Sequence, residues 1–157
     1  MSAVEDRLKE LGLTLPDVAL PVAAYVPAVR DGNMIFTSGQ LPMVSGALVQ
    51  TGKVGAGGGL VSPDDAKKLA QTCALNAIAA VKSVIGDLDK VTRVVKVVGF
   101  VASEPSFTGQ PGVINGASEL LGIAFGDAGV HARSAVGVAS LPLDAPVEVE
   151  ITVSVQD

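Results

Sequence analysis

Arg133 is the charged residue with the most unusual surroundings in this sequence. It begins the stretch Arg133–Pro142, in which every other residue is apolar or small. An unpaired buried guanidinium is costly, so the stretch predicts an anionic partner for Arg133. A planar guanidinium can hold a carboxylate through two parallel hydrogen bonds. That carboxylate belongs either to a structural glutamate, Glu148 or Glu150, or to a small ligand, and the residues alone leave both interpretations open.

Glu148 and Glu150 are the carboxylates best placed to do chemistry. They lie in Val147–Val155, where apolar and polar residues alternate, so both are expected on the polar face of one strand. A carboxylate beside a bound substrate can position or activate a water molecule. The other interpretation is a solvated strand face, which is the one favoured for Glu150.

The chain contains one histidine, His131, and one cysteine, Cys73. No serine lies in a Gly-x-Ser-x-Gly motif, so His131 is interpreted as a partly exposed loop histidine and not as part of a catalytic triad. Cys73 lies on the apolar stripe of an expected helix and is assigned to the core. A zinc site would need acidic ligands as well, so no metal is expected. The glycines of Gly55–Gly59 lack the Lys-Ser/Thr of a phosphate-binding loop and indicate flexibility.

Strands and helices follow one another in an order that could bring these residues together. Apolar runs predict two strands joined at Asp31-Gly32, a dipeptide typical of hairpin turns. Ser62-Pro63 predicts the start of a helix that ends at Gly86. The expected helices are Val4–Gly12, a helix from Pro63 to Gly86, and Phe107–Phe125; the expected strands are Tyr25–Arg30, Met34–Ser38, Leu48–Gln50, Val91–Val101, Ala132–Leu141 and Val147–Val155.

This order predicts an α+β domain whose helices cover one face of a mixed sheet. The chain of 157 residues is expected to form one domain over residues 21–157, preceded by an N-terminal helix and extension over residues 1–20. The other face of such a sheet would carry uncovered apolar residues. Large apolar patches rarely stay exposed, so the chain is expected to form an oligomer.

The amino-acid composition bears on which partners the protein binds and on where in the cell it is expected. The net charge is −5, aromatic residues make up 3%, and the 11 basic residues are scattered, which argues against nucleic-acid binding. The longest uncharged stretch, between Asp31 and Lys53, contains polar residues and Pro42, so no membrane-spanning helix is expected. The charged N-terminus is unlike a secretory signal, and the single cysteine fits a reducing compartment. A cytoplasmic location is therefore expected.

Two blocks of the sequence are specific when taken together. The first is Tyr25–Pro42, with a strand ending in Thr-Ser-Gly-Gln followed by a hydrophobic residue and proline. The second combines Ala132–Val136, Leu141-Pro142 and Val147–Glu150. Both blocks resemble those of the RidA/YjgF family, and the resemblance extends from about Pro21 to the C-terminus.

The resemblance implies a chorismate mutase-like α+β fold and a homotrimer with sites between subunits. It implies hydrolysis of reactive enamines and imines, such as 2-aminoacrylate, to 2-oxo acids and ammonia, without a metal or an organic cofactor. The implied ligand is a small imine or oxo acid that carries a carboxylate. Some members of the family are described as endoribonucleases of the L-PSP type or as translation inhibitors.

The resemblance also implies roles for individual residues. Arg133 falls on the arginine that holds the substrate carboxylate, and Glu148 on the acid associated with the water. Tyr25 and Asn115 fall on residues that line the site, and Gly39 falls on the backbone near it.

Three departures indicate a divergent, longer branch of that family. Ala135 stands where a cysteine is common, the N-terminus carries an added helix, and the loop Gly126–His131 is enlarged. The alternatives are a non-catalytic protein that binds a small carboxylate and acts through a partner, a ribonuclease, and a purely structural role for Arg133. The acidic composition and the single histidine argue against the ribonuclease.

Overall fold

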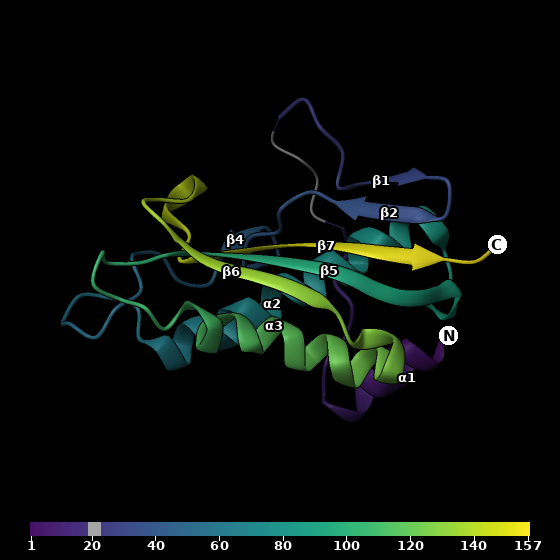
Figure 1. The fold of residues 1–157 in the computed structure, drawn as a ribbon, viewed down its shortest axis with the longest axis horizontal. Helices are drawn as coiled ribbons and strands as arrows, with labels where there is room; N and C mark the ends of the chain where they lie inside the picture. Colours follow the sequence, from purple (N-terminus) through teal and green to yellow (C-terminus); the bar gives the residue numbers. More distant parts are fainter. Residues whose placement is uncertain (19–22) are drawn as a thin grey trace.

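The computed structural model describes residues 1–18 and 23–157, and these form a mixed α+β fold (Figure 1). The boundary expected between residues 20 and 21 lies outside the described residues, as does Pro21, where the resemblance begins. Within the described ranges the helices are α1 (Ala3–Glu10), α2 (Pro63–Ile85) and α3 (Gln110–Phe125), with short 3-10 turns at Leu88–Lys90, Gly126–Gly129 and Pro142–Asp144.

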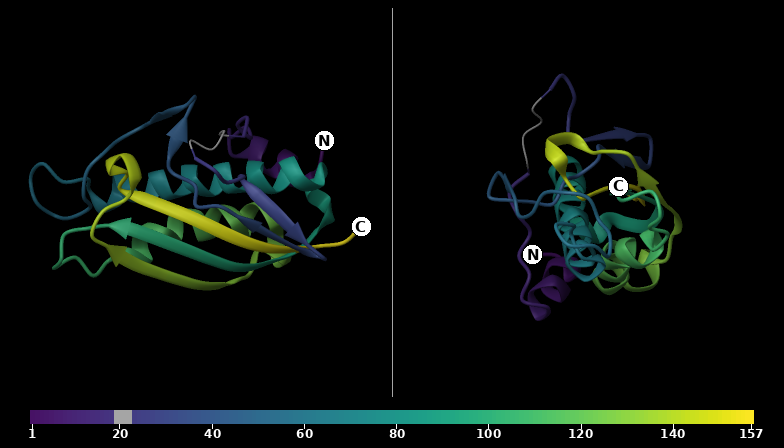
Figure 2. Two further views of the ribbon diagram at one scale, coloured as in Figure 1. Left: turned by 90° about the horizontal axis from the view of Figure 1, so that it is seen from above. Right: turned by 90° about the vertical axis from the view of Figure 1, so that its left-hand side faces the viewer.

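A five-stranded sheet in the order β1-β2-β7-β5-β6 supports the helices. Its strands are β1 (Ala28–Asp31), β2 (Met34–Thr37), β5 (Val91–Ala102), β6 (Ala132–Val138) and β7 (Val147–Val155), and β3 (Met43–Val44) pairs separately with β4 (Ala47–Leu48). Strands β5 and β6 are parallel, and the other pairs are antiparallel. Both α2 and α3 lie on the same face of the sheet (Figure 2), which confirms the expected layer order.

Tight turns set the positions of the first strands. Gly32 has a φ of 60°, so the first hairpin turns through left-handed backbone, as Asp31-Gly32 predicts. Ser45 and Gly46, with φ values of 52° and 81°, turn the second hairpin in the same way. Strand β1 begins three residues later than expected. Pro27, just before it, has no N–H to add to a strand ladder.

The two long helices begin at identifiable residues. Ser62 Oγ accepts a hydrogen bond from the Asp65 N–H at 3.1 Å and caps α2, as expected. Helix α3 begins at Gln110 and not at Phe107, because Glu104–Phe107 forms a turn and Gln110 donates from its side chain to the Phe107 carbonyl. The two helices pack closely at Gly116, where a Cβ atom would overlap the carbonyl oxygen of Lys67.

The side chains of strand β7 alternate between the two faces of the sheet. Its five odd-numbered residues, from Val147 to Val155, are buried against the helices. Its even-numbered residues, Glu148 and Glu150 among them, lie on the face that the helices leave uncovered. Cys73, on α2, is fully buried in the core, as predicted.

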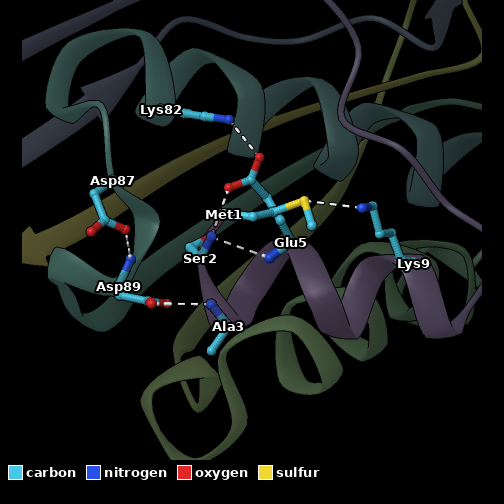
Figure 3. A network of polar contacts seen from close by, with 8 residues as sticks. All are labelled: Met1, Ser2, Ala3, Glu5, Lys9, Lys82, Asp87 and Asp89. Carbon is cyan, nitrogen blue, oxygen red and sulfur yellow. Dashed lines mark hydrogen bonds and ion pairs between the residues drawn. The ribbon is translucent and has the colours of Figure 1, made fainter.

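The N-terminal helix is attached to α2 by a polar cluster (Figure 3). Ser2 Oγ accepts from the Glu5 N–H at 3.2 Å, and Glu5 Oε2 accepts from the Ser2 N–H at 3.1 Å, forming a capping box. The second carboxylate oxygen of Glu5 meets the ammonium of Lys82. The hydrogen bond from Lys82 and that from the Ser2 N–H lower the pKa of Glu5 to about 2. Val4 and Leu8 complete the attachment by entering the core.

No helix in the described ranges is both long and apolar enough to span a lipid bilayer.

Candidate functional site

Arg133 projects from β6, an edge strand, towards α3. Its backbone pairs with Val97 of β5, and Val97 pairs with Ile151 of β7, so these residues point to the helix-covered face. Nη1 donates to Asn115 Oδ1 at 2.8 Å and to Ser118 Oγ at 3.2 Å. Nη2 makes a longer contact, 3.4 Å, with the Pro111 carbonyl. All three acceptors belong to α3, so this helix holds the guanidinium at the edge of the sheet.

The acceptors around Arg133 are neutral. Among residues 1–18 and 23–157, no carboxylate lies within ion-pair distance of its guanidinium. The interpretation that paired Arg133 with Glu148 or Glu150 is wrong for a single chain. Glu148 pairs laterally with Phe100, which pairs with Val136, and this row lies on the opposite face of the sheet from Arg133. The positive charge of Arg133 is therefore held in place without being neutralised.

Glu148 lies half-buried on the uncovered face, against the backbone of Gly39. A Cβ atom on residue 39 would overlap Glu148 Oε1, so glycine leaves the space that the carboxylate occupies. Gln40, next in the chain, exchanges two backbone hydrogen bonds with Val149, at 2.8 and 3.0 Å, and fixes Gly39 beside β7. Burial, and secondly the charge of Glu150, raise the pKa of Glu148.

Tyr25 and Ala135 lie on different sides of the molecule. Tyr25 is 51% exposed and precedes β1; its neighbour Val26 accepts from Ser38 Oγ at 2.6 Å, next to Gly39. Ala135 lies two residues beyond Arg133 on β6 and packs partly buried against the core. The residues that the sequence analysis selected thus fall into two groups. The edge group is Arg133, Asn115 and Ala135, and the face group is Tyr25, Gly39 and Glu148.

Ser118 and His131 complete the edge group. His131 is a partly exposed loop side chain, as expected, but its contacts were not predicted: Nε2 lies 2.9 Å from Ser118 Oγ and Nδ1 lies 2.6 Å from the Gly129 carbonyl. Ser118 lies three residues after Asn115, so the two share one face of α3. This three-residue spacing is the sequence feature that could have indicated Ser118 as a member of the edge group.

No set of three or more His, Cys, Asp or Glu side chains in the described ranges is arranged to hold a metal ion. Cavities of about 430 and 670 Å³ lie beside Thr14–Val18 on the N-terminal segment. Neither cavity is lined by Arg133 or Glu148.

Comparison with known proteins identifies the family. Residues 5–153 match the family described as "YjgF/chorismate mutase-like, putative endoribonuclease". The chain belongs to this family. The resemblance that the sequence blocks indicated is thereby confirmed, together with the YjgF/chorismate mutase-like fold.

Individual proteins also match along most of the chain. Protein TCP17 of Trypanosoma cruzi is 43% identical over 155 residues, which cover 98% of this chain and 95% of that protein. The crystal structure of Atu1372 from Agrobacterium tumefaciens, a protein of unknown function, is 48% identical with a TM-score of 0.90 and covers 98% and 93% of the two chains. E. coli TdcF with bound serine shares the fold, at 23% identity and a TM-score of 0.64 over 89% and 94% of the chains.

Proposed function

We propose that this YjgF-family protein hydrolyses small 2-imino acids and their enamine tautomers, of which 2-aminoacrylate is the type, to 2-oxo acids and ammonia. The observation that carries the proposal is the guanidinium of Arg133, which neutral oxygens hold in place and no carboxylate of the described chain neutralises. A fixed, uncompensated guanidinium suits a substrate carboxylate. The serine bound to TdcF, which shares the fold, is a small molecule with such a carboxylate.

Glu148 supplies the proton transfers of the proposed reaction. It accepts a proton from a water molecule as the water oxygen bonds to the C=N carbon, and it returns the proton to nitrogen. In the resulting carbinolamine the hydroxyl proton passes, by way of Glu148, to nitrogen as the C–N bond breaks, so ammonia leaves and the hydroxyl-bearing carbon becomes the carbonyl of the oxo acid. One water is consumed for each ammonia released. The raised pKa of Glu148 supports this role, because a carboxyl group with a pKa closer to neutral both accepts and returns protons efficiently.

Two chains contribute to each proposed site, because Arg133 and Glu148 lie on opposite faces of one sheet. Arg133 is on the edge strand β6, which leaves its outer side open for a neighbouring subunit. The uncovered face carries Val29, Phe36 and Val136, exposed by 51%, 43% and 44%. A homotrimer that buries this face would bring the edge group of one subunit to the face group of the next. In that assembly residues 21–157 form the catalytic domain, and residues 1–20 are an appended helix and extension.

Turnover of 2-aminoacrylate tests the reaction directly. A serine dehydratase generates the enamine in place, and oxo-acid formation is followed with and without this protein. We expect acceleration by the wild-type protein and a loss of about 100-fold in Arg133→Ala, because a charged hydrogen-bonded pair is lost. Equal acceleration by a folded Arg133→Ala protein, or none by the wild type, contradicts the proposal.

Mixing two inactive variants tests the shared site. Arg133→Ala and Glu148→Gln are unfolded together and refolded as a mixture. If each site takes Arg133 from one subunit and Glu148 from the next, about a quarter of the interfaces regain both native groups. Activity returns in the mixture and in neither variant alone. A mixture that stays inactive while exchanging subunits contradicts a site formed between two chains.

Binding of a carboxylate without chemistry is the second function that the same Arg133 supports. Calorimetric titration with 2-oxobutanoate separates the two, because tight binding by a protein that shows no turnover favours the binding function. The endoribonuclease named in the family description receives less support from this chain. Its net charge of −5 opposes the phosphate contacts on which RNA binding depends.

A further inference from the structure

Ser118 and His131 have no part in the reaction written above, yet they form an ordered hydrogen-bonded chain that ends on Arg133. We propose that they are positioning residues, which fix the guanidinium so that a substrate carboxylate meets one defined edge of it. This inference rests on the proposed function and adds a specificity device to the same site.

The direction of each hydrogen bond in this chain follows from what each group can do. The Gly129 carbonyl only accepts, so His131 Nδ1, at 2.6 Å, carries the hydrogen. In the neutral ring Nε2 is then an acceptor, and the Ser118 hydroxyl donates to it over 2.9 Å. Arginine only donates, so Arg133 Nη1 donates to the Ser118 oxygen at 3.2 Å.

This order holds the lone pairs of Ser118 towards Arg133. With its hydrogen engaged by His131, the hydroxyl cannot rotate to point that hydrogen at the guanidinium. Asn115 Oδ1 takes the other hydrogen of Nη1, at 2.8 Å. Both hydrogens of Nη1 are thus occupied by acceptors on α3, and rotation about the last bonds of Arg133 is opposed.

The donors that remain define how a carboxylate binds. Nη2 makes only the 3.4 Å contact with the Pro111 carbonyl. No acceptor for Nε occurs among the described residues. Nε and Nη2 lie along one edge of the guanidinium and match the two oxygens of a carboxylate. The brace formed by Ser118 and His131 therefore selects side-on binding through Nε and Nη2.

The tautomer of His131 gives a first test that needs no substrate. The chain has a single histidine, so its imidazole nitrogen signals in a ¹H–¹⁵N spectrum require no assignment. We expect the neutral ring to carry its hydrogen on Nδ1. A ring with its hydrogen on Nε2 would reverse the chain of bonds and overturn the inference.

Kinetic variants give the second test. Ser118→Ala should raise KM for 2-aminoacrylate, and the Kd for 2-oxobutanoate, about tenfold while kcat stays close to wild type, because one hydrogen bond that aims Arg133 is lost. Ser118→Thr keeps the hydroxyl and should restore KM. His131→Phe should raise KM in the same direction. Ser83→Ala is the matched control: Ser83 is exposed on α2 and donates within its own helix, so its loss leaves KM unchanged.

The outcomes separate this inference from the proposed function. If the wild type is active and Ser118→Ala has unchanged KM and Kd, the brace is overturned and the reaction stands. If Ser118→Ala only lowers the melting temperature, and threonine does not restore KM, the role is structural and the inference also fails. If the wild type neither turns over 2-aminoacrylate nor binds 2-oxobutanoate, the proposed function fails, and the side-on binding inferred from it fails as well. The tautomer still decides whether the chain of bonds to Arg133 runs in the stated direction.

Discussion

Lys82 and Arg133 each reach from one element to another, but only Lys82 meets a carboxylate. Lys82 joins α2 to Glu5 of α1, and the two charges neutralise each other. Arg133 joins β6 to α3 through amide, hydroxyl and carbonyl oxygens, none of them charged. The first arrangement is complete within one chain and attaches a helix. In the second arrangement the hydrogen bonds orient the guanidinium of Arg133 without neutralising its charge. The charge can therefore bind an anion.

The strongest test of this contrast keeps the positive charge at residue 133 and removes the planar guanidinium group. Arg133→Lys retains one positive charge, but an ammonium cannot bond to α3 and present a flat edge to a carboxylate at the same time. We expect kcat/KM to fall at least about tenfold and the melting temperature to stay within about 2 °C, by steady-state kinetics and calorimetry. Arg93→Lys, on an exposed position of β5, is the matched control. Wild-type kinetics in Arg133→Lys would show that charge alone is sufficient.

Lys82 should show the opposite pattern. Lys82→Met leaves Glu5 without its cation, and we expect the free energy of unfolding to fall by about 1 kcal/mol with kcat/KM unchanged. Denaturant titration measures the first and the oxo-acid assay the second. Lys68→Met, on an exposed position of the same helix, should change neither. A loss of activity that exceeds the loss of folded protein would mean that the N-terminal cluster contributes to the site.

Acid should weaken the N-terminal cluster in a defined range of pH. The pKa of Glu5 is about 2 in the folded chain, below its ordinary value of 4.5, so its contribution is complete above 4.5 and is lost as the pH falls towards 2. The difference in unfolding free energy between wild type and Glu5→Gln should therefore shrink across that range. Glu10→Gln, exposed on the same helix, serves as the control. A difference that stays constant from pH 5 to pH 2 would contradict the role of the Glu5 charge.

Glu148 should respond to pH with the opposite sign, and with the smallest effect. Its pKa is raised in the folded chain, so the folded state binds the proton more tightly, and stability is lost as the pH rises through that raised value. Glu148→Gln removes the cost of the buried charge and should raise the melting temperature at pH 7 by about 1–3 °C, with no gain at pH 4. Calorimetry at the two pH values checks this. A lower melting temperature at pH 7 would mean that the carboxylate is stabilised in the fold.

Local signals predicted most of the fold. Ser62 and Gly86 mark the ends of α2, and the alternation in Val147–Val155 gave β7 with its two faces. Helix ends and strand alternation depend on residues that are close together in the sequence, so they can be predicted from the sequence alone. The end of β6 at Val138 and the start of α3 at Gln110 depend on strand pairing and on a side-chain contact, and both were placed three residues away.

The relation between Arg133 and Glu148 could not be predicted from the sequence. Alternation shows which residues of one strand share a face, but not how two strands are aligned. That alignment passes through β5, which pairs with β6 on one side and with β7 on the other. The contact between Ser118 and His131 likewise requires α3 to lie against the start of β6. Its apolar surroundings selected Arg133 and family resemblance selected Asn115, whereas only the structure gives the hydrogen bond between them.

The absent side chain at Gly116 connects the packing of two helices to the chemistry of Arg133. Residue 116 lies between Asn115 and Ser118 in α3, and it is here that α3 comes against the backbone of α2 at Lys67. An added methyl group would widen the gap between the helices and carry both acceptors away from the guanidinium. The glycine thus acts as a fixed spacer for the site. A change in the packing between the two helices would therefore lower the affinity for a ligand.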